Sequence, residues 1–481
     1  MVPDDGERRN DEEMPEAKEA APAVGNVPSG RIARTARFGK LVGGQSLRWA
    51  GTRAANLTRD EEASERRMEE RALKLADELV EQLGHMRGAA MKIGQVLSTV
   101  DFDAIPEGER ENFKAKLAAL RDSAPPIAFP KMRKLVESDL GGKLSEFFSD
   151  FDENAFAAAS IGQVHRATTH DGDDVVVKIQ YPGVAEAVET DMRNMNVLLP
   201  LVKRLAPGLD GKALLGELRE RIGEELDYEI EAQNQRRVER AFRDHPFIKV
   251  PKVHSDLSAR RVLVSEYVEG AGFEEVRKLK ESDRDRYGEI VFRFFMTSLH
   301  RERFCSGDPH PGNYLRRPDG SVCFLDFGLM RQVSEKTLRS EHALAAAVLG
   351  EDADGVKAQL SSLGYLPNPD EFDPQMLYEQ VRVAGEWAFE PGFRRITPDY
   401  VRELAEVGSS PRSPYFHQMR QMTLPPEALL VRRMEALVFS VLGELRAGGD
   451  WNAVGQEFWA GGEPSTELGR IDAEWRASAG R

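Results

Sequence analysis

The sequence predicts an α+β fold with two lobes, the first holding a small β-sheet and the second built mainly from helices. Residues 155–180, AFAAASIGQVHRATTHDGDDVVVKIQ, read as strands separated by a loop of small residues and an Asp-Gly turn. From 184 to 243, and again after about 275, apolar residues recur at helical spacing, interrupted after Cys305 by a hairpin-like segment. Strand-rich sequence followed by helical sequence is typical of this class.

The bulk composition is that of an acidic globular chain. Its 481 residues are 41% hydrophobic and 31% charged, with a formal net charge of −15. This charge argues against a protein that coats nucleic acid. The presence of only two cysteines fits a reducing compartment. No apolar run approaches the roughly 20 residues that span a bilayer, and the N-terminus does not resemble a secretory signal. We expect a cytoplasmic chain, and the sequence does not set its oligomeric state.

Changes in composition divide the chain into five expected segments. They are a disordered acidic tail (1–30), a basic segment followed by a helical extension (31–150), a strand-containing lobe with a helical insert (151–268), a helical lobe (269–450) and a loosely ordered tail (451–481) whose aromatic residues Trp451, Phe458 and Trp459 can pack back.

The basic segment supports two interpretations. Residues 31–59 contain seven Lys or Arg residues and no acidic residue, with apolar side chains such as Trp49 between them. The segment either packs on the protein's own acidic surface or makes peripheral contact with an anionic membrane or lipid.

A lysine and a glutamate form the first part of a chemical constellation. Lys178 ends the apolar strand 175–177, and a buried lysine is costly unless an anion pairs with it. In a nucleotide site the anion is a phosphate, assisted by a carboxylate from a nearby helix such as 225–234.

Two acids and an amide form the second part. Asp308, Asn313 and Asp326 supply hard oxygen ligands of the kind that Mg²⁺ prefers in company with phosphate oxygens. A strand lysine, a helix glutamate, an Asp-x4-Asn loop and an Asp-Phe-Gly triplet, in this order, match the protein-kinase plan, so we expect ATP and Mg²⁺ as cofactors.

Four motifs limit the resemblance to one family of kinases. MKIGQ at 91–95, AAAS at 157–160, ELDYEIEAQN at 225–234 and DPHPGN at 308–313 resemble the UbiB/AarF (ADCK) family of atypical kinases, over roughly residues 70–345. The resemblance implies a bilobal protein-kinase-like fold with an N-terminal helical extension. It also implies an ATP-dependent phosphotransferase or ATPase, linked to isoprenoid lipid or quinone metabolism.

The resemblance also implies roles for individual residues. Lys178 would contact the α- and β-phosphates and pair with Glu231, Asn313 and Asp326 would hold magnesium, and Asp308 would stand where a kinase base stands. The remaining expected cofactor-binding residues are Ala157, Ala158, Ala159, Ser160 and Glu266. In place of a glycine-rich loop, Ser160 or Gly162 would allow close approach to the phosphates; the alternative is an ordinary packed turn.

A gate over the site is implied by the KxGQ motif. Lys92 and Gln95 project from one face of a helix, and Glu225 with Asp227 would supply acidic partners. The alternative is a plain structural ion pair.

Two departures from the family bear on activity. Ser306 stands where the family has a histidine, two residues before Asp308, and no activation segment or Ala-Pro-Glu platform follows Gly328. We therefore favour slow ATP hydrolysis or small-molecule phosphorylation over protein phosphorylation. The alternatives are a pseudokinase, or a nucleotide-gated module that binds lipid or a partner. In the last case the apolar stripe at 428–445, predicted as core, would line a lipid-sized groove.

Overall fold

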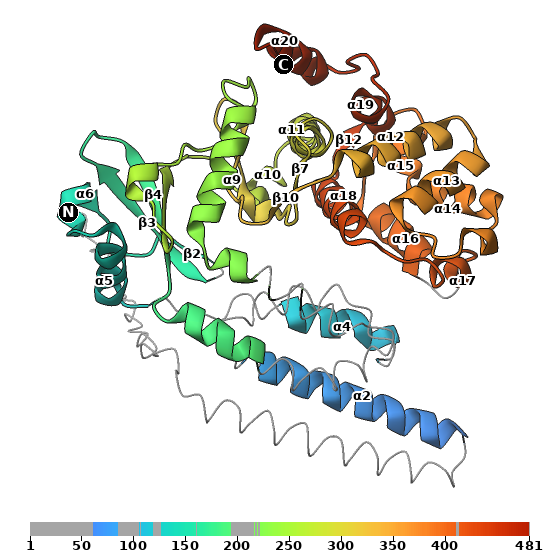
Figure 1. The fold of residues 1–481 in the computed structure, drawn as a ribbon, viewed down its shortest axis with the longest axis horizontal. Helices are drawn as coiled ribbons and strands as arrows, with labels where there is room; N and C mark the ends of the chain where they lie inside the picture. Colours follow the sequence, from blue (N-terminus) through green and yellow to red (C-terminus); the bar gives the residue numbers. More distant parts are fainter. Residues whose placement is uncertain are drawn as a thin grey trace, which may run out of the picture.

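The computed structural model describes residues 61–84, 105, 107–118, 127–159, 161–193, 216, 219, 222–409 and 413–480. These residues form a sheet-containing N-lobe and a helical C-lobe, with helices of an N-terminal extension beside them (Figure 1). The predicted α+β arrangement in two lobes is confirmed. Within the described residues, no helix is both long and apolar enough to cross a membrane.

The N-lobe is built on one antiparallel sheet in the order β1–β3–β4–β6, with β2 also paired to β3. Along β4, buried Val175, Val177 and Ile179 alternate with half-buried Lys178, so the lysine lies on the face opposite the valines. The strands are β1 (Phe148–Phe151), β2 (Ala157–Ala159), β3 (Gly162–Thr169), β4 (Asp174–Gln180) and β6 (Val262–Glu266).

Helices complete the N-lobe. Buried Met132 and Val136 pack in one core with the sheet valines, and their helix ends at Gly141, whose φ is 78°. The helices are α5 (Phe129–Leu140), α6 (Leu144–Phe147), the segment 184–193 and α9 (Tyr228–Ala241). In Figure 1, α9 lies on the side of the sheet that faces the C-lobe.

The C-lobe surrounds one long buried helix, α11 (Glu281–His300) (Figure 1). Its Phe292 and Phe295 share a core with Met434 and Leu442. The other helices are α10 (Phe273–Val276), α12 (Glu335–Leu349), α13 (Ala353–Leu363), α14 (Pro374–Ala384), α15 (Glu386–Phe389), α16 (Pro398–Ser409), α17 (Phe416–Met419), α18 (Pro426–Leu445), α19 (Trp451–Trp459) and α20 (Glu467–Ser478), with 3-10 turns η2 (Ser255–Leu257), η3 (Pro311–Asn313) and η4 (Pro369–Glu371).

Short strands carry the loops that were expected to hold the chemistry. The predicted hairpin is confirmed, because β8 pairs antiparallel with β9 around a turn at Gly320. β10 pairs with β7, and β5 runs parallel to β9. The bounds are β5 (Ile248–Lys249), β7 (Phe304–Ser306), β8 (Tyr314–Arg316), β9 (Val322–Phe324), β10 (Met330–Gln332), β11 (Arg394–Arg395) and β12 (Gly448–Gly449).

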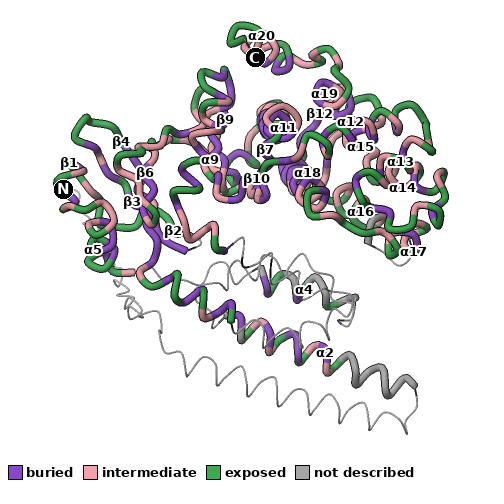
Figure 2. The backbone as a smooth tube through the Cα atoms, viewed as in Figure 1, coloured by how far each residue is buried: buried purple, intermediate pink, exposed green. Residues whose placement is uncertain are grey.

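The N-terminal extension contributes α2 (Glu61–Gly84) and α4 (Glu107–Ala118). The expected helical extension is present in these helices: Leu75, Leu79 and Leu83, three or four residues apart in α2, are buried and join the N-lobe core. Figure 2 shows buried positions recurring along α2. The acidic tail, the basic segment 31–59, Lys92 and Gln95 all lie outside the described residues.

The C-terminal segment differs from the loosely ordered tail predicted for 451–481. It forms α19 and α20, and Trp451 and Phe458 are buried in the C-lobe core, as expected for anchoring aromatics. Thr466 caps α20 by accepting the Gly469 backbone N–H at 3.0 Å.

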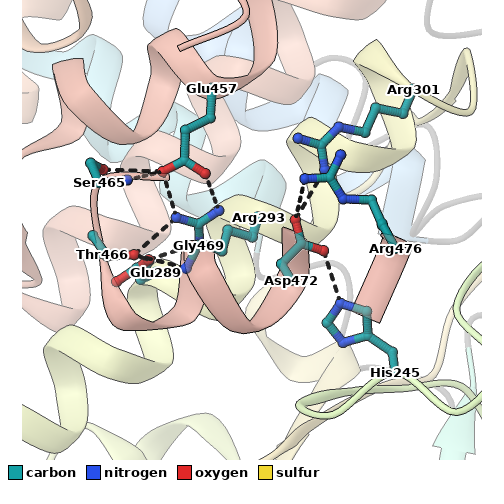
Figure 3. Close-up of polar contacts among 10 residues, drawn as sticks. All are labelled: His245, Glu289, Arg293, Arg301, Glu457, Ser465, Thr466, Gly469, Asp472 and Arg476. Atoms are coloured by element: carbon teal, nitrogen blue, oxygen red, sulfur yellow. Dashed lines mark hydrogen bonds and ion pairs between the residues drawn. The ribbon is translucent and has the colours of Figure 1, made fainter. Parts of the chain in front are cut away.

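A buried polar network explains the order of this tail (Figure 3). Arg293 of α11 donates to both carboxylate oxygens of Glu457, at 2.8 and 2.9 Å. Asp472 of α20 accepts from Arg301 at 3.0 Å and lies 3.2 Å from His245. The partners of the first pair are 164 residues apart in the sequence, so no local pattern predicts it.

Candidate active site

An ion pair joins the N-lobe sheet to helix α9. The Nζ of Lys178 donates to both carboxylate oxygens of Glu231, at 2.8 and 2.9 Å. Asp227 begins α9 by accepting the Glu229 backbone N–H, which fixes the first turn that carries Glu231. The predicted pair of strand lysine and helix glutamate is therefore present, with Glu231 buried and Lys178 half-buried.

The pair sits in a charged and aromatic environment. Burial by itself lowers the pKa of Lys178, but nearby negative charge, that of Glu231 first, outweighs burial and holds this pKa above its usual value. The buried ring of Tyr228 lies 5.0 Å from the Nζ of Lys178. Lys178 therefore keeps its positive charge at neutral pH and remains suited to a phosphate.

The two expected metal ligands meet in space. The side-chain amide of Asn313 donates to the carboxylate of Asp326 at 3.1 Å. The β8–β9 pairing produces this contact, because Asn313 precedes one strand, Asp326 follows the other, and the Leu325 N–H donates to the Asn313 carbonyl at 3.0 Å. The side chains of Asn313 and Asp326 are therefore neighbours.

The backbone of the Asp-Phe-Gly triplet passes close to both Asp326 and the Lys178–Glu231 pair. A Cβ on Gly328 would stand 3.4 Å from the Asp326 carboxylate and 3.9 Å from that of Glu231, so the backbone passes beside both groups. Asn234 of α9 donates to the Phe327 carbonyl at 2.9 Å. α9 therefore positions the triplet as well as Glu231.

Asp308 lies in the loop that leaves β7. Buried Ser306 accepts the Asp308 backbone N–H through its Oγ at 3.3 Å, which is long for a hydrogen bond. The Gly307 N–H donates to the Leu329 carbonyl at 2.7 Å, which holds this loop against the segment after the triplet. His310 acts as a loop strut, since its Nδ1 accepts the Gly312 N–H at 3.1 Å.

The alanine-rich stretch forms an edge strand. Ala157, Ala158 and Ala159 make up β2 and pair with Val164, Gln163 and Gly162. Ser160 lies outside the described residues. Gly162 does allow a close approach, but to the neighbouring strand: a Cβ there would stand 2.1 Å from the Ile179 carbonyl oxygen, next to Lys178.

The other predicted residues lie farther from the pair. Glu266 pairs with Val175 across the β4–β6 ladder, three residues along β4 from Lys178, and its carboxylate accepts the Lys252 N–H at 3.2 Å. Of the gate acids, Glu225 is half-buried just before α9, and Asp227 also lies 3.7 Å from Arg260.

Tyr228 and Asn234 belong to the ELDYEIEAQN motif, but their contacts with Lys178 and the Phe327 carbonyl were not predicted from the sequence. The spacing along the helix could have identified them, because Tyr228, Glu231 and Asn234 recur every three residues and so lie near one face of α9.

The donor set fits magnesium when phosphate supplies the remaining ligands. Asn313 and Asp326 offer amide and carboxylate oxygens, and Mg²⁺ is usually held by one or two such groups plus phosphate and water. The described residues contain no group of three or more His, Cys, Asp or Glu side chains that could hold a metal without help.

Comparison with known proteins gives the family. The sequence model of the ABC1 atypical kinase-like domain matches residues 119–360. AarF domain-containing protein kinase 1 of Mus musculus is 33% identical over 300 residues, which are 61% of this chain and 56% of that protein. Atypical kinase COQ8B, mitochondrial, of Rattus norvegicus is 32% identical over 345 residues, 71% of this chain and 64% of that protein. The chain thus matches only a little over half the length of these curated relatives.

A solved structure also resembles this chain in fold and sequence. The Mycobacterium tuberculosis protein Rv3197, determined in complex with erythromycin, has a TM-score of 0.60 and 31% identity, covering 80% of this chain and 95% of that one. The kinase-like fold expected from the resemblance is confirmed. The chain belongs to the ABC1 atypical kinase-like family, the family of the UbiB/AarF kinases.

Proposed function

We propose that the protein binds Mg-ATP between its lobes and transfers or hydrolyses the γ-phosphoryl group. The observation that carries the proposal is the convergence of two contacts: Lys178 with Glu231, and Asn313 with Asp326, joined through the backbone of Gly328. A fixed cation beside two hard oxygen donors is the arrangement that phosphoryl transfer needs, since positioning and charge stabilisation supply most of its catalysis.

Each residue then has a distinct task. Lys178 holds the α- and β-phosphates, and Glu231 fixes the lysine side chain. Asn313 and Asp326 hold magnesium, which neutralises charge on the phosphates when bound. Asp308, positioned by Ser306, accepts the proton of the attacking hydroxyl or water. β2 covers the nucleotide from the N-lobe side, with Glu266 at the edge of the cofactor site.

The acceptor is a water molecule or a small molecule rather than a peptide. Directly after Gly328 the chain enters β10, which pairs with β7, and Ser334 already caps α12. This leaves no long segment for a peptide to dock against. The family resemblance favours a place in isoprenoid lipid or quinone metabolism. We propose that the chain acts in the cytoplasm and contacts a membrane peripherally through residues 31–59. We also propose a gate over the nucleotide site, formed by Lys92, Gln95, Glu225 and Asp227.

A second candidate is a pseudokinase whose nucleotide gates binding of lipid or a partner. The long hydrogen bond from Ser306 to the Asp308 N–H favours it, because a weakly held loop gives slow chemistry.

Phosphate release and Mg-ATP calorimetry on three proteins separate these functions. The proteins are wild type, Asp326→Asn, and the control Asp319→Asn, which changes an exposed carboxylate in the turn of the same hairpin. We expect Asp326→Asn to lose at least tenfold in release while the control stays within twofold. Equal release by all three would exclude catalysis at this site, and binding without turnover in wild type would support the pseudokinase. No binding heat at all would overturn both.

A further inference from the structure

A large cavity lies inside the C-lobe, away from every residue of the candidate active site. Its volume is about 510 Å³, within the range of small-molecule pockets. Helices α11, α12, α14, α15, α16, α18 and α19 all contribute to its wall, which is mostly apolar. Aromatic side chains include Trp387, Phe389, Phe439 and Trp459. The apolar stripe of α18 thus lines this cavity with part of its face and packs in the core with the rest.

The cavity wall contains polar atoms that no described residue satisfies. His300 Nε2, Glu341 Oε1 and Trp459 Nε1 are buried and have no hydrogen-bond partner within the described part of the chain. The rings of His300 and Trp459 are 6.0 Å apart. Buried polar groups are almost always paired, because leaving them unpaired costs folding free energy. Three of them on one cavity wall indicate a missing polar partner.

The charges of the wall exclude an anionic partner. Arg432 already donates to Glu341, Glu435 and the Tyr365 hydroxyl, so its positive charge is matched. Burial, with Arg432 and other neighbouring groups, keeps the pKa of His300 at about 3, and the imidazole is therefore neutral. An added negative charge would face two carboxylates and no free cation in this cluster.

We propose that this cavity binds an uncharged, largely apolar molecule that carries a hydroxyl group. The Trp459 N–H needs an acceptor and the Glu341 oxygen needs a donor, and a hydroxyl group can act in either role. The aromatic wall packs the apolar body of the ligand. The proposal is independent of nucleotide chemistry, since none of the residues assigned to Mg-ATP lines the cavity.

The test uses the full chain and N-phenyl-1-naphthylamine, an uncharged probe whose fluorescence rises in apolar surroundings. Ala436 and Ala384 line the cavity from α18 and α14, so Ala436→Trp and Ala384→Trp should fill it and weaken probe binding at least tenfold. Ala346→Trp is the matched control, because this helical alanine is exposed and lies outside the cavity. It should bind the probe within twofold of wild type.

Competition then tests the ligand class. Decan-1-ol should displace the probe at lower concentration than decanoate, and Trp459→Phe should weaken the alcohol about two- to tenfold while leaving the probe within twofold. Unchanged probe binding in both blocking variants, or equal displacement by decanoate, would overturn the proposal. Mg-ATP calorimetry on the same variants should match wild type, so that failure here and failure of the nucleotide site are distinguishable.

Discussion

The Nζ of Lys178 lies 2.8 and 2.9 Å from the two carboxylate oxygens of Glu231, and this one pair connects β4 to α9. Because α9 also holds the Phe327 carbonyl through Asn234, a change in the pair is transmitted to the Asp-Phe-Gly triplet. Helix α9 therefore contacts both Lys178 and the segment that carries Asp326, the proposed metal ligand.

Glu231→Gln should lower phosphate release at least tenfold and the free energy of unfolding by about 1–3 kcal/mol, because Lys178 then keeps its charge without an anion. We expect a smaller loss of unfolding free energy than for a fully buried ion pair, since the Lys178 side chain is 24% exposed. Urea denaturation and a phosphate-release assay measure the two effects.

The double variant Lys178→Met with Glu231→Gln is the control for that interpretation. Removing both charges should cost less stability than the sum of the single changes, as expected for a coupled pair. Strictly additive losses would mean that Lys178 and Glu231 do not stabilise each other in the folded state.

Asn313→Ala should raise the magnesium concentration for half-maximal phosphate release by about tenfold, because one of the two oxygen donors is lost. A magnesium titration at saturating ATP measures this change. The matched variant is Asn234→Ala, which loosens the Phe327 backbone without removing a metal ligand. It should lower the maximal rate and leave the magnesium midpoint within twofold; identical midpoints for Asn313→Ala and wild type would argue against the metal role.

Ser306→Ala should lower the maximal rate about three- to tenfold and leave Mg-ATP affinity unchanged. Its Oγ accepts the Asp308 backbone N–H at 3.3 Å, so its loss should loosen the loop that carries Asp308. Steady-state kinetics separate the two parameters. A higher apparent KM at an unchanged maximal rate would contradict this role.

The sequence predicted the pairing of Lys178 with Glu231 and the hairpin that carries Asn313 better than it predicted the C-terminus, for physical reasons. Lys178 was visible because one charge ends an apolar strand, and the meeting of Asn313 with Asp326 followed from a hairpin whose turn contains Gly320. Both rest on local patterns. The approach of Gly328 to Glu231 depends on tertiary packing and left no local trace.

The order of α19 and α20 was missed because distant charges hold them. Arg293 and Glu457 pair across 164 residues, and Asp472 joins α20 to α11 and to His245. Thr466, which caps α20, was the available local signal for the helix, although not for its docking.

Arg293→Leu should destabilise the protein by about 3–5 kcal/mol, because it leaves the carboxylates of Glu457 and Glu289 without their cation. Both side chains of the main pair are at most 2% exposed. Arg339→Leu is the matched control: it breaks the exposed pair with Glu335 and should cost less than about 1 kcal/mol. Equal midpoints of urea denaturation for the two variants would contradict a structural role for the tail network.

Asp472→Asn should lower the free energy of unfolding by about 2 kcal/mol at pH 7, and the loss should depend on pH. Burial favours the neutral acid, but His245, Arg476 and Arg301 outweigh it and lower the pKa from 3.8 to about 2.

A carboxyl whose folded pKa lies below its unfolded pKa contributes stability above the unfolded value, and this stability is lost as pH falls toward the folded value. The gap between wild type and Asp472→Asn should therefore persist from pH 7 to pH 5 and narrow below about pH 4. Urea denaturation at a series of pH values measures the gap. A gap that closed already above pH 5 would contradict the lowered pKa of Asp472 as its cause.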